Sequence, residues 1–144
     1  MVATLSRKFS IDQDRIYATG FSNGGFFCYL LWAERPKVFA AIAPGAAGLV
    51  PSFRPQTPKP VFIYGGRNDR LVPFATQQDA IAAALKLNGC EAEGRACGEN
   101  CTIFDSLQSH MPVATFIHSS GHVFVPATKP LIVQFFNEHP ELNR

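Results

Sequence analysis

A serine set among small residues, directly after a short apolar run, is the feature that most restricts how this 144-residue chain can fold. The run leads into Gly20-Phe21-Ser22-Asn23-Gly24, and an unbroken apolar segment, residues 26–33, follows it. This order predicts a strand over residues 15–21, a tight turn at Ser22 and a buried helix. Small residues two before and two after the serine let strand and helix approach closely, as in the G-x-S-x-G pattern of a nucleophile elbow. The competing interpretation is a Ser-Gly loop without chemistry.

The rest of the chain alternates between the same two kinds of segment. Further strands are predicted at residues 39–43, 61–65 and 113–118, with an optional short strand at 102–104, and further helices at 3–9, 75–87 and 130–137. Strands that alternate with helices predict a parallel sheet covered on both faces. We therefore expect one α/β domain over residues 1–144, built as a three-layer sandwich. In such sheets ligands bind beyond the carboxyl ends of the strands.

Three residues that can carry chemistry fall just past predicted strand ends: Ser22, Asp69 and His122. A serine hydroxyl is a poor nucleophile until a neighbouring imidazole takes its proton, and a carboxylate must hold that imidazole in the right tautomer. We therefore expect Ser22 as nucleophile, His122 as base and Asp69 as the orienting acid. The backbone N–H of Asn23, at the start of the predicted helix, would donate to the oxyanion.

Other acids and histidines compete for these roles. Asp69 can also be an ordinary turn or capping residue, and His122 a surface histidine. His122 is preferred because Gly121 gives its loop the backbone freedom that a catalytic loop needs. The less favoured alternatives lie in predicted helices, in the polar loop, beside the sheet or near the C-terminus: Asp79, Asp105, His110, His118 and His139.

The composition of the chain restricts the kinds of partner that it is expected to bind. The net charge of +2 comes from scattered Lys and Arg, so nucleic acid is not an expected partner. The longest apolar run, residues 26–33, is far shorter than the roughly 18 residues that cross a bilayer, so no membrane contact is expected. Residues 1–10 contain no apolar core of signal-peptide length.

The four cysteines are unevenly placed. Cys28 lies in the predicted buried helix, whereas Cys90, Cys97 and Cys101 cluster in a polar loop. The cluster favours a disulfide over a structural metal, because it lacks paired C-x₂-C spacing and includes no histidine. Free thiols remain the third possibility, and neither a metal nor a cofactor is expected.

At the level of family, Asp14–Gly25 and Phe39–Gly45 resemble the polyhydroxybutyrate depolymerase and feruloyl esterase group of α/β-hydrolases. The chain order of serine, aspartate and histidine is also the α/β-hydrolase order. Further short segments continue the match in register: Asn68-Asp69 with Val72-Pro73, Asn88-Gly89-Cys90, Gly121-His122 and Gln134-Phe135-Phe136.

The resemblance implies a carboxylester hydrolase that acts on phenolic esters, acetylated polysaccharides or short polyesters, in a parent protein that is secreted or periplasmic. It also implies that Cys90 pairs with a cysteine on the later excursion, which favours Cys101, with Cys97 as the alternative. Two other functions stay open. A prolyl-oligopeptidase-like peptidase shares the G-x-S-x-G-G turn and an aspartate followed by Val-Pro, and a catalytically silent binding domain could retain the same residues.

The chain departs from the group in two respects. Val123-Phe124-Val125-Pro126 replaces the usual Gly-rich segment with a tryptophan, which leaves the substrate pocket undefined. The group's first strands and its His-Gly oxyanion segment have no counterpart before Met1. We therefore expect the C-terminal portion of a larger hydrolase, or a minimal variant, with the strand at 15–21 as an exposed edge. Self-association would cover that edge, and esterase activity would be slow without a second oxyanion donor.

Overall fold

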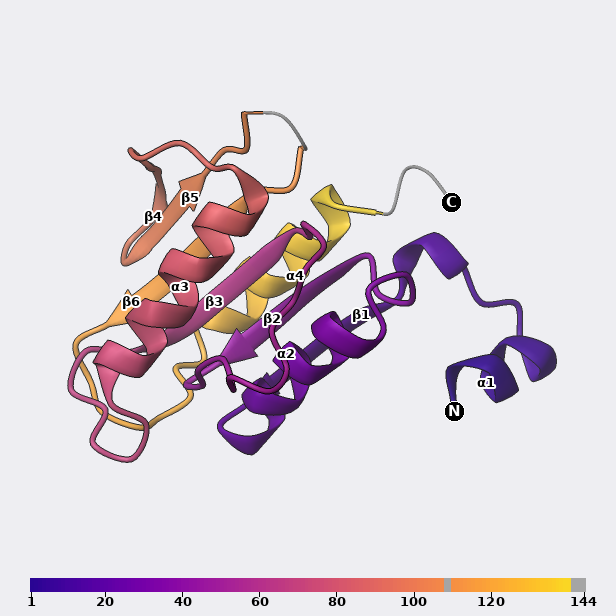
Figure 1. Cartoon of the computed structure of the whole chain (residues 1–144), viewed down its shortest axis with the longest axis horizontal. Coiled ribbons are helices and arrows are strands. Elements are labelled where there is room, and N and C mark those ends of the chain that lie inside the picture. Colours follow the sequence, from indigo (N-terminus) through magenta and orange to yellow (C-terminus); the bar gives the residue numbers. More distant parts are fainter. Residues whose placement is uncertain (108–109, 141–144) are drawn as a thin grey trace.

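The computed structural model describes residues 1–107 and 110–140 (Figure 1). Its elements, in chain order, are α1 (Val2–Lys8), a 3₁₀ turn η1 (Gln13–Arg15), β1 (Tyr17–Phe21), α2 (Asn23–Glu34), β2 (Ala41–Gly45), β3 (Val61–Gly66), α3 (Phe74–Asn88), β4 (Arg95–Gly98), β5 (Cys101–Phe104), β6 (Val113–His118) and α4 (Thr128–Glu138). None of the helices in these ranges combines the length and apolarity that crossing a membrane requires.

The strands form one six-stranded sheet in the order β1-β2-β3-β6-β5-β4. β1, β2, β3 and β6 run parallel, whereas β5 pairs antiparallel with β6 and β4 pairs antiparallel with β5. The four parallel strands confirm the predicted sheet, and β1 lies at its end, as expected for residues 15–21. The polar cysteine loop adds an antiparallel hairpin, β4–β5, at the edge of β6, of which only the short strand at 102–104 was foreseen.

Alternating side chains of the central strands divide the core into two layers. On β3, Val61 and Ile63 face the helices α2 and α3, with Tyr29 and Trp32 of α2 in the same cluster. The intervening Phe62 and Tyr64 face the opposite side, where α4 packs. Figure 1 shows α2 and α3 on one side of the sheet and α4 on the other. The expected three-layer sandwich is therefore present, because parallel strands have two apolar faces to cover.

Element boundaries differ from the expectation by a few residues. β2 spans Ala41–Gly45 rather than 39–43, and α2 begins at Asn23, directly after the serine, rather than at residue 26. The short strand expected at 102–104 is present as β5. The carboxyl ends of β1, β3 and β6 share one edge of the sheet, because the three strands are parallel. Ser22 follows β1 there, and the segments with Asp69 and His122 follow the other two strands.

Candidate active site

Ser22 occupies a strained turn between β1 and α2. Its φ of 56° and ψ of −117° lie in a region that a non-glycine residue seldom adopts. The turn is held at both ends, because the Ser22 N–H donates to the Gly45 carbonyl at 2.9 Å and the Ser22 carbonyl accepts from the Phe26 N–H at 3.0 Å. The side chain is thereby fixed at the carboxyl edge of the sheet.

The glycines flanking this turn are not equivalent. A Cβ added at Gly20 would lie 2.4 Å from the backbone carbon of Gly24, so residue 20 must lack a side chain for strand and helix to meet. A Cβ added at Gly24 would meet nothing within 4 Å. The expectation that small residues are needed on both sides is therefore right for Gly20 and wrong for Gly24.

Asp69 lies in the turn after β3, and its side chain is fully buried. Its Oδ1 accepts hydrogen bonds from the N–H groups of Leu71 and Val72, each at 2.9 Å. Burial raises the pKa of the Asp69 carboxyl, but hydrogen bonds from His122 and from these two N–H groups together lower it by more, so the pKa lies below its usual value. The carboxylate is consequently ionised at neutral pH.

His122 lies in the loop after β6, between the other two side chains. Its Nδ1 is 2.8 Å from Asp69 Oδ2, and its Nε2 is 3.0 Å from Ser22 Oγ. An ionised carboxylate only accepts hydrogen bonds, so Nδ1 carries the proton and Nε2 is left to accept the Ser22 hydroxyl hydrogen. The Phe21 ring packs against the imidazole, with 4.9 Å between ring centroids. These contacts join the three predicted residues in one hydrogen-bonded chain.

The competing residues have other neighbours. Asp105 forms an exposed ion pair with Arg95 at 2.9 Å, and Asp79 is exposed on α3. His118 is buried and accepts a hydrogen bond from the Ser120 N–H, whereas His139 donates to the Phe135 carbonyl. His110 lies in the polar loop beside the opposite, amino-terminal edge of the sheet, near Pro112. Of the histidines within residues 1–107 and 110–140, only His122 is hydrogen-bonded to Ser22.

Asn23 is the first residue of α2. The first N–H groups of a helix have no intrahelical acceptor and point along the positive end of the helix dipole. The oxyanion role of the Asn23 N–H stays a prediction, which its position at the start of α2 supports.

Sequence reasoning missed Gln77, which hydrogen-bonds to Asp69. Its Nε2 donates to Asp69 Oδ2 at 3.1 Å and to the Val72 carbonyl at 2.8 Å, and the residue is 1% exposed. A signal was available, because Gln77 lies three residues before Ala80 and seven before Ala84, on the same buried face of α3. A polar residue on such a face needs a polar partner.

A disulfide is present in the cysteine cluster, as predicted, but the prediction that Cys90 takes part in it is wrong. Cys97 pairs with Cys101, at a Cα–Cα distance of 5.1 Å, while Cys90 and Cys28 are free. The bond spans the turn of the β4–β5 hairpin, where Gly98 is opposite Cys101. Cys90 lies at the other end of the polar loop, where its backbone pairs with that of Ser106 in an isolated antiparallel β-bridge. No cluster of metal-binding side chains occurs in the described part of the chain.

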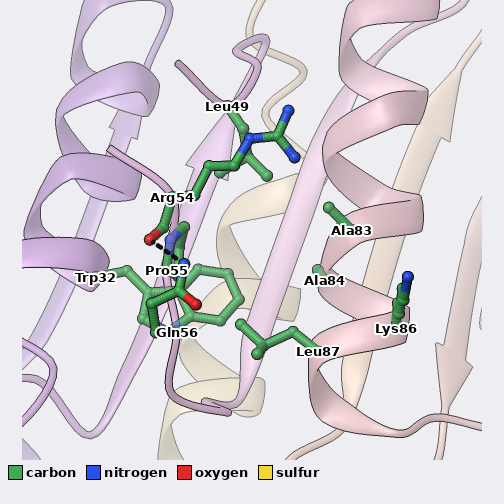
Figure 2. A pocket seen from close by; sticks show the side chains of 9 residues that line it. All are labelled: Trp32, Leu49, Arg54, Pro55, Gln56, Ala83, Ala84, Lys86 and Leu87. Atoms are coloured by element: carbon green, nitrogen blue, oxygen red, sulfur yellow. Dashed lines mark hydrogen bonds between the residues drawn. The ribbon is translucent and has the colours of Figure 1, made fainter. Parts of the chain in front are cut away.

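An apolar hollow of about 410 Å³ lies between α2 and α3. Figure 2 shows Trp32 of α2 and Leu87 of α3 extending toward each other across it, while Lys86 points away from Trp32. Trp32 is ten residues along α2 from Ser22, or about 15 Å at the helical rise. The part of the hollow that Trp32 lines is therefore distant from Ser22.

Solved structures of esterases share this arrangement of elements. The Bacillus cereus carboxylesterase superposes with a TM-score of 0.69 and 14% identity, covering 95% of this chain and 56% of that one. The acetyl xylan esterase from Aspergillus awamori gives a TM-score of 0.68 and 15% identity, over 95% of this chain and 64% of that one. The chain has the α/β-hydrolase fold.

Sequence relatives of this α/β-hydrolase chain carry esterase and depolymerase names. Feruloyl esterase B of Piromyces equi is 26% identical over 145 residues, covering 84% of this chain and 27% of the relative. Poly(3-hydroxyalkanoate) depolymerase C of Paucimonas lemoignei is 44% identical over 48 residues, covering 33% of this chain and 12% of the relative. The prolyl oligopeptidase family matches residues 1–51. These matches support the polyhydroxybutyrate depolymerase and feruloyl esterase group, and this chain spans about a quarter or less of either relative.

Proposed function

We propose that this chain carries the catalytic centre of a serine carboxylester hydrolase. The observation that carries the proposal is the continuous hydrogen-bonded chain from Ser22 Oγ through His122 to the buried Asp69, at the carboxyl edge of a parallel sheet. The esterase names among the relatives support the same reaction class. Phenolic, acetyl or short polyester groups are the proposed substrates.

The reaction follows from the roles of the three side chains. Ser22 Oγ attacks the ester carbonyl while its proton passes to His122 Nε2, and Asp69 stabilises the imidazolium. The tetrahedral intermediate collapses, the alcohol leaves with the proton from Nε2, and an acyl group stays on Ser22. Water then attacks the acyl carbonyl, giving its proton to His122, and the carboxylic acid is released as Ser22 regains a proton.

The proposed site has fewer hydrogen-bond donors for the oxyanion than efficient acyl transfer needs. Asn23 N–H supplies one donor, and the described residues offer no second donor that we can assign. Losing one of two donors typically costs about 10²–10³ in turnover. We therefore expect slow hydrolysis, unless a segment along β1 or a second copy of the chain supplies the missing N–H group.

A fluorophosphonate probe tests the nucleophile directly. Mass spectrometry of the labelled protein is expected to place the adduct on Ser22, and Ser22→Ala should abolish labelling. A suitable control is Ser120→Ala, which removes a hydroxyl at the same sheet edge and leaves Ser22 in place. Labelling that persists in Ser22→Ala would contradict the assignment.

A peptidase is the second candidate, favoured by the match of residues 1–51 to the prolyl oligopeptidase family. The same three side chains can cleave an amide, so the substrate decides between the two functions. Hydrolysis of methyl ferulate and p-nitrophenyl acetate should exceed that of proline anilides. The opposite ranking, with both activities lost in Ser22→Ala, would assign a peptidase instead.

The disulfide supports an oxidising location for the parent protein. Disulfides persist in secreted and periplasmic proteins and are rare in the cytosol. The Cys97–Cys101 bond therefore favours the secreted or periplasmic location that the resemblance implies.

A further inference from the structure

The buried amide of Gln77 has an orientation that its surroundings dictate. Its Nε2 donates to two oxygen atoms, Asp69 Oδ2 and the Val72 carbonyl. Exchanging the amide nitrogen and oxygen would place Oε1 against these two acceptors, and no hydrogen bond could form. Gln77 therefore presents an N–H group to the carboxylate that faces His122.

Burial of the amide oxygen of Gln77, Oε1, is energetically unfavourable. Gln77 Oε1 is buried and has no hydrogen-bond partner among the described residues. The sheet makes room for it with a glycine, because a Cβ added at Gly65 would lie 1.8 Å from Oε1. A buried polar atom without a partner is unfavourable, so an apolar side chain of similar length would suit this site better on packing grounds. Packing alone gives no reason for glutamine here.

We propose that Gln77 is a positioning residue that holds the Asp69 carboxylate in the plane in which Oδ2 faces His122. The proposal rests on the catalytic function proposed for Ser22, His122 and Asp69. Oδ1 is fixed by N–H groups of Asp69's own turn, whereas Oδ2 is held by Gln77 and by His122 itself. Because α3 is a 15-residue helix packed on the sheet, Gln77 ties the carboxylate to a rigid element.

This role predicts a specific kinetic signature. Without the Gln77 N–H group the carboxylate can turn, and the hydrogen bond to His122 Nδ1 weakens. The base is then less well oriented for the proton transfer, while Gln77 stays enclosed in the core and out of reach of a bound ester. We therefore expect kcat to fall about tenfold with KM unchanged, the equivalent of one lost hydrogen bond to a charged group.

The test compares Gln77→Met and Gln77→Leu, two apolar replacements of different shape that both remove the amide and its N–H donor. The matched control is Gln78→Met, the same change at the exposed neighbouring position on α3. Steady-state hydrolysis of p-nitrophenyl acetate gives kcat and KM. Both Gln77 variants should lose kcat, and Gln78→Met should behave as the unmodified protein.

Proton NMR provides a readout that does not need turnover. The His122 Nδ1 proton, hydrogen-bonded to a carboxylate, should give a low-field resonance that His122→Gln removes. It should shift upfield or broaden in both Gln77 variants and stay in place in Gln78→Met.

An absence of Ser22-dependent turnover would contradict the proposed function, but the His122 resonance would still test the role of Gln77. An unchanged resonance in folded Gln77 variants would overturn the positioning role. Failure of both variants to fold would also overturn it, because the amide would then be structural.

Discussion

At the scale of single residues, Asp69 is the group on which the proposed chemistry depends most. Asp69→Asn keeps the size of the side chain but replaces an ionised acceptor by an amide, so His122 is no longer held with its proton on Nδ1. In the well-studied serine protease triad this change lowers kcat about 10⁴-fold. We expect a loss of that order in p-nitrophenyl acetate hydrolysis.

The control is Asp79→Asn, the same substitution at an exposed position on α3, which should leave kcat unchanged. Equal rates for Asp69→Asn and the control would show that Asp69 takes no part in the reaction.

Asp69 also makes the stability of the fold depend on pH. Its pKa is lowered in the folded protein, so the ionised carboxylate stabilises the fold. This contribution is full above the unfolded-state pKa of about 3.9 and is lost as the pH falls through the lower folded value.

Urea unfolding between about pH 6 and about pH 2 measures this contribution. The free-energy difference between the unmodified protein and Asp69→Asn should shrink as the pH falls. A difference that is constant over this range would contradict a lowered Asp69 pKa.

At the scale of secondary-structure elements, the junction of β1 and α2 depends on one glycine. A methyl group at residue 20 would overlap the backbone of Gly24, whereas a methyl group at residue 24 would meet open space. Gly20→Ala should lower the free energy of unfolding by about 1–3 kcal/mol, as overpacking does. Gly24→Ala should be neutral or slightly stabilising, because alanine favours helix. Urea denaturation of the two variants provides the comparison, and equal losses would refute the close contact between β1 and α2 at residue 20.

The β4–β5 hairpin carries the disulfide. Non-reducing peptide mapping should find Cys97 linked to Cys101, with Cys90 and Cys28 free. Burial raises the pKa of Cys28 to about 12, so its thiol should resist alkylation at neutral pH until the protein unfolds. Because the closed loop is short, removing the bond with Cys97→Ser should cost only about 2 kcal/mol. A Cys90–Cys101 peptide would contradict the hairpin register.

The elements that could be predicted from the sequence are those with a strong local pattern. The apolar runs of β1, β3 and β6 and the breaks after them locate the parallel strands and place Ser22, Asp69 and His122 at strand ends. β4 was missed because it is short and mostly exposed, so it has no apolar alternation. The pairing of Cys97 and the contact of Gln77 with Asp69 depend on tertiary neighbours. Spacing along the chain does not contain that information.

At the scale of the whole molecule, the described sheet ends in the strand that leads into Ser22, the proposed nucleophile. β1 lies at the edge of the described sheet, and the serine turn follows it directly. An open edge can pair with another strand, and the proposed site has one assigned oxyanion donor, the Asn23 N–H. Both features concern the same side of the molecule, so we expect self-association and slow turnover to be found in the same sample.

The measurement that tests the central claim most directly is p-nitrophenyl acetate turnover by a purified sample of known oligomeric state, with Ser22→Ala prepared identically. The proposed triad predicts slow hydrolysis that Ser22→Ala abolishes, in a sample that light scattering shows to be self-associated. Equal hydrolysis by both proteins, or none by a well-folded unmodified protein, would contradict Ser22 as the nucleophile of an esterase. A monomer with ordinary esterase rates would instead contradict the inference of a missing second donor.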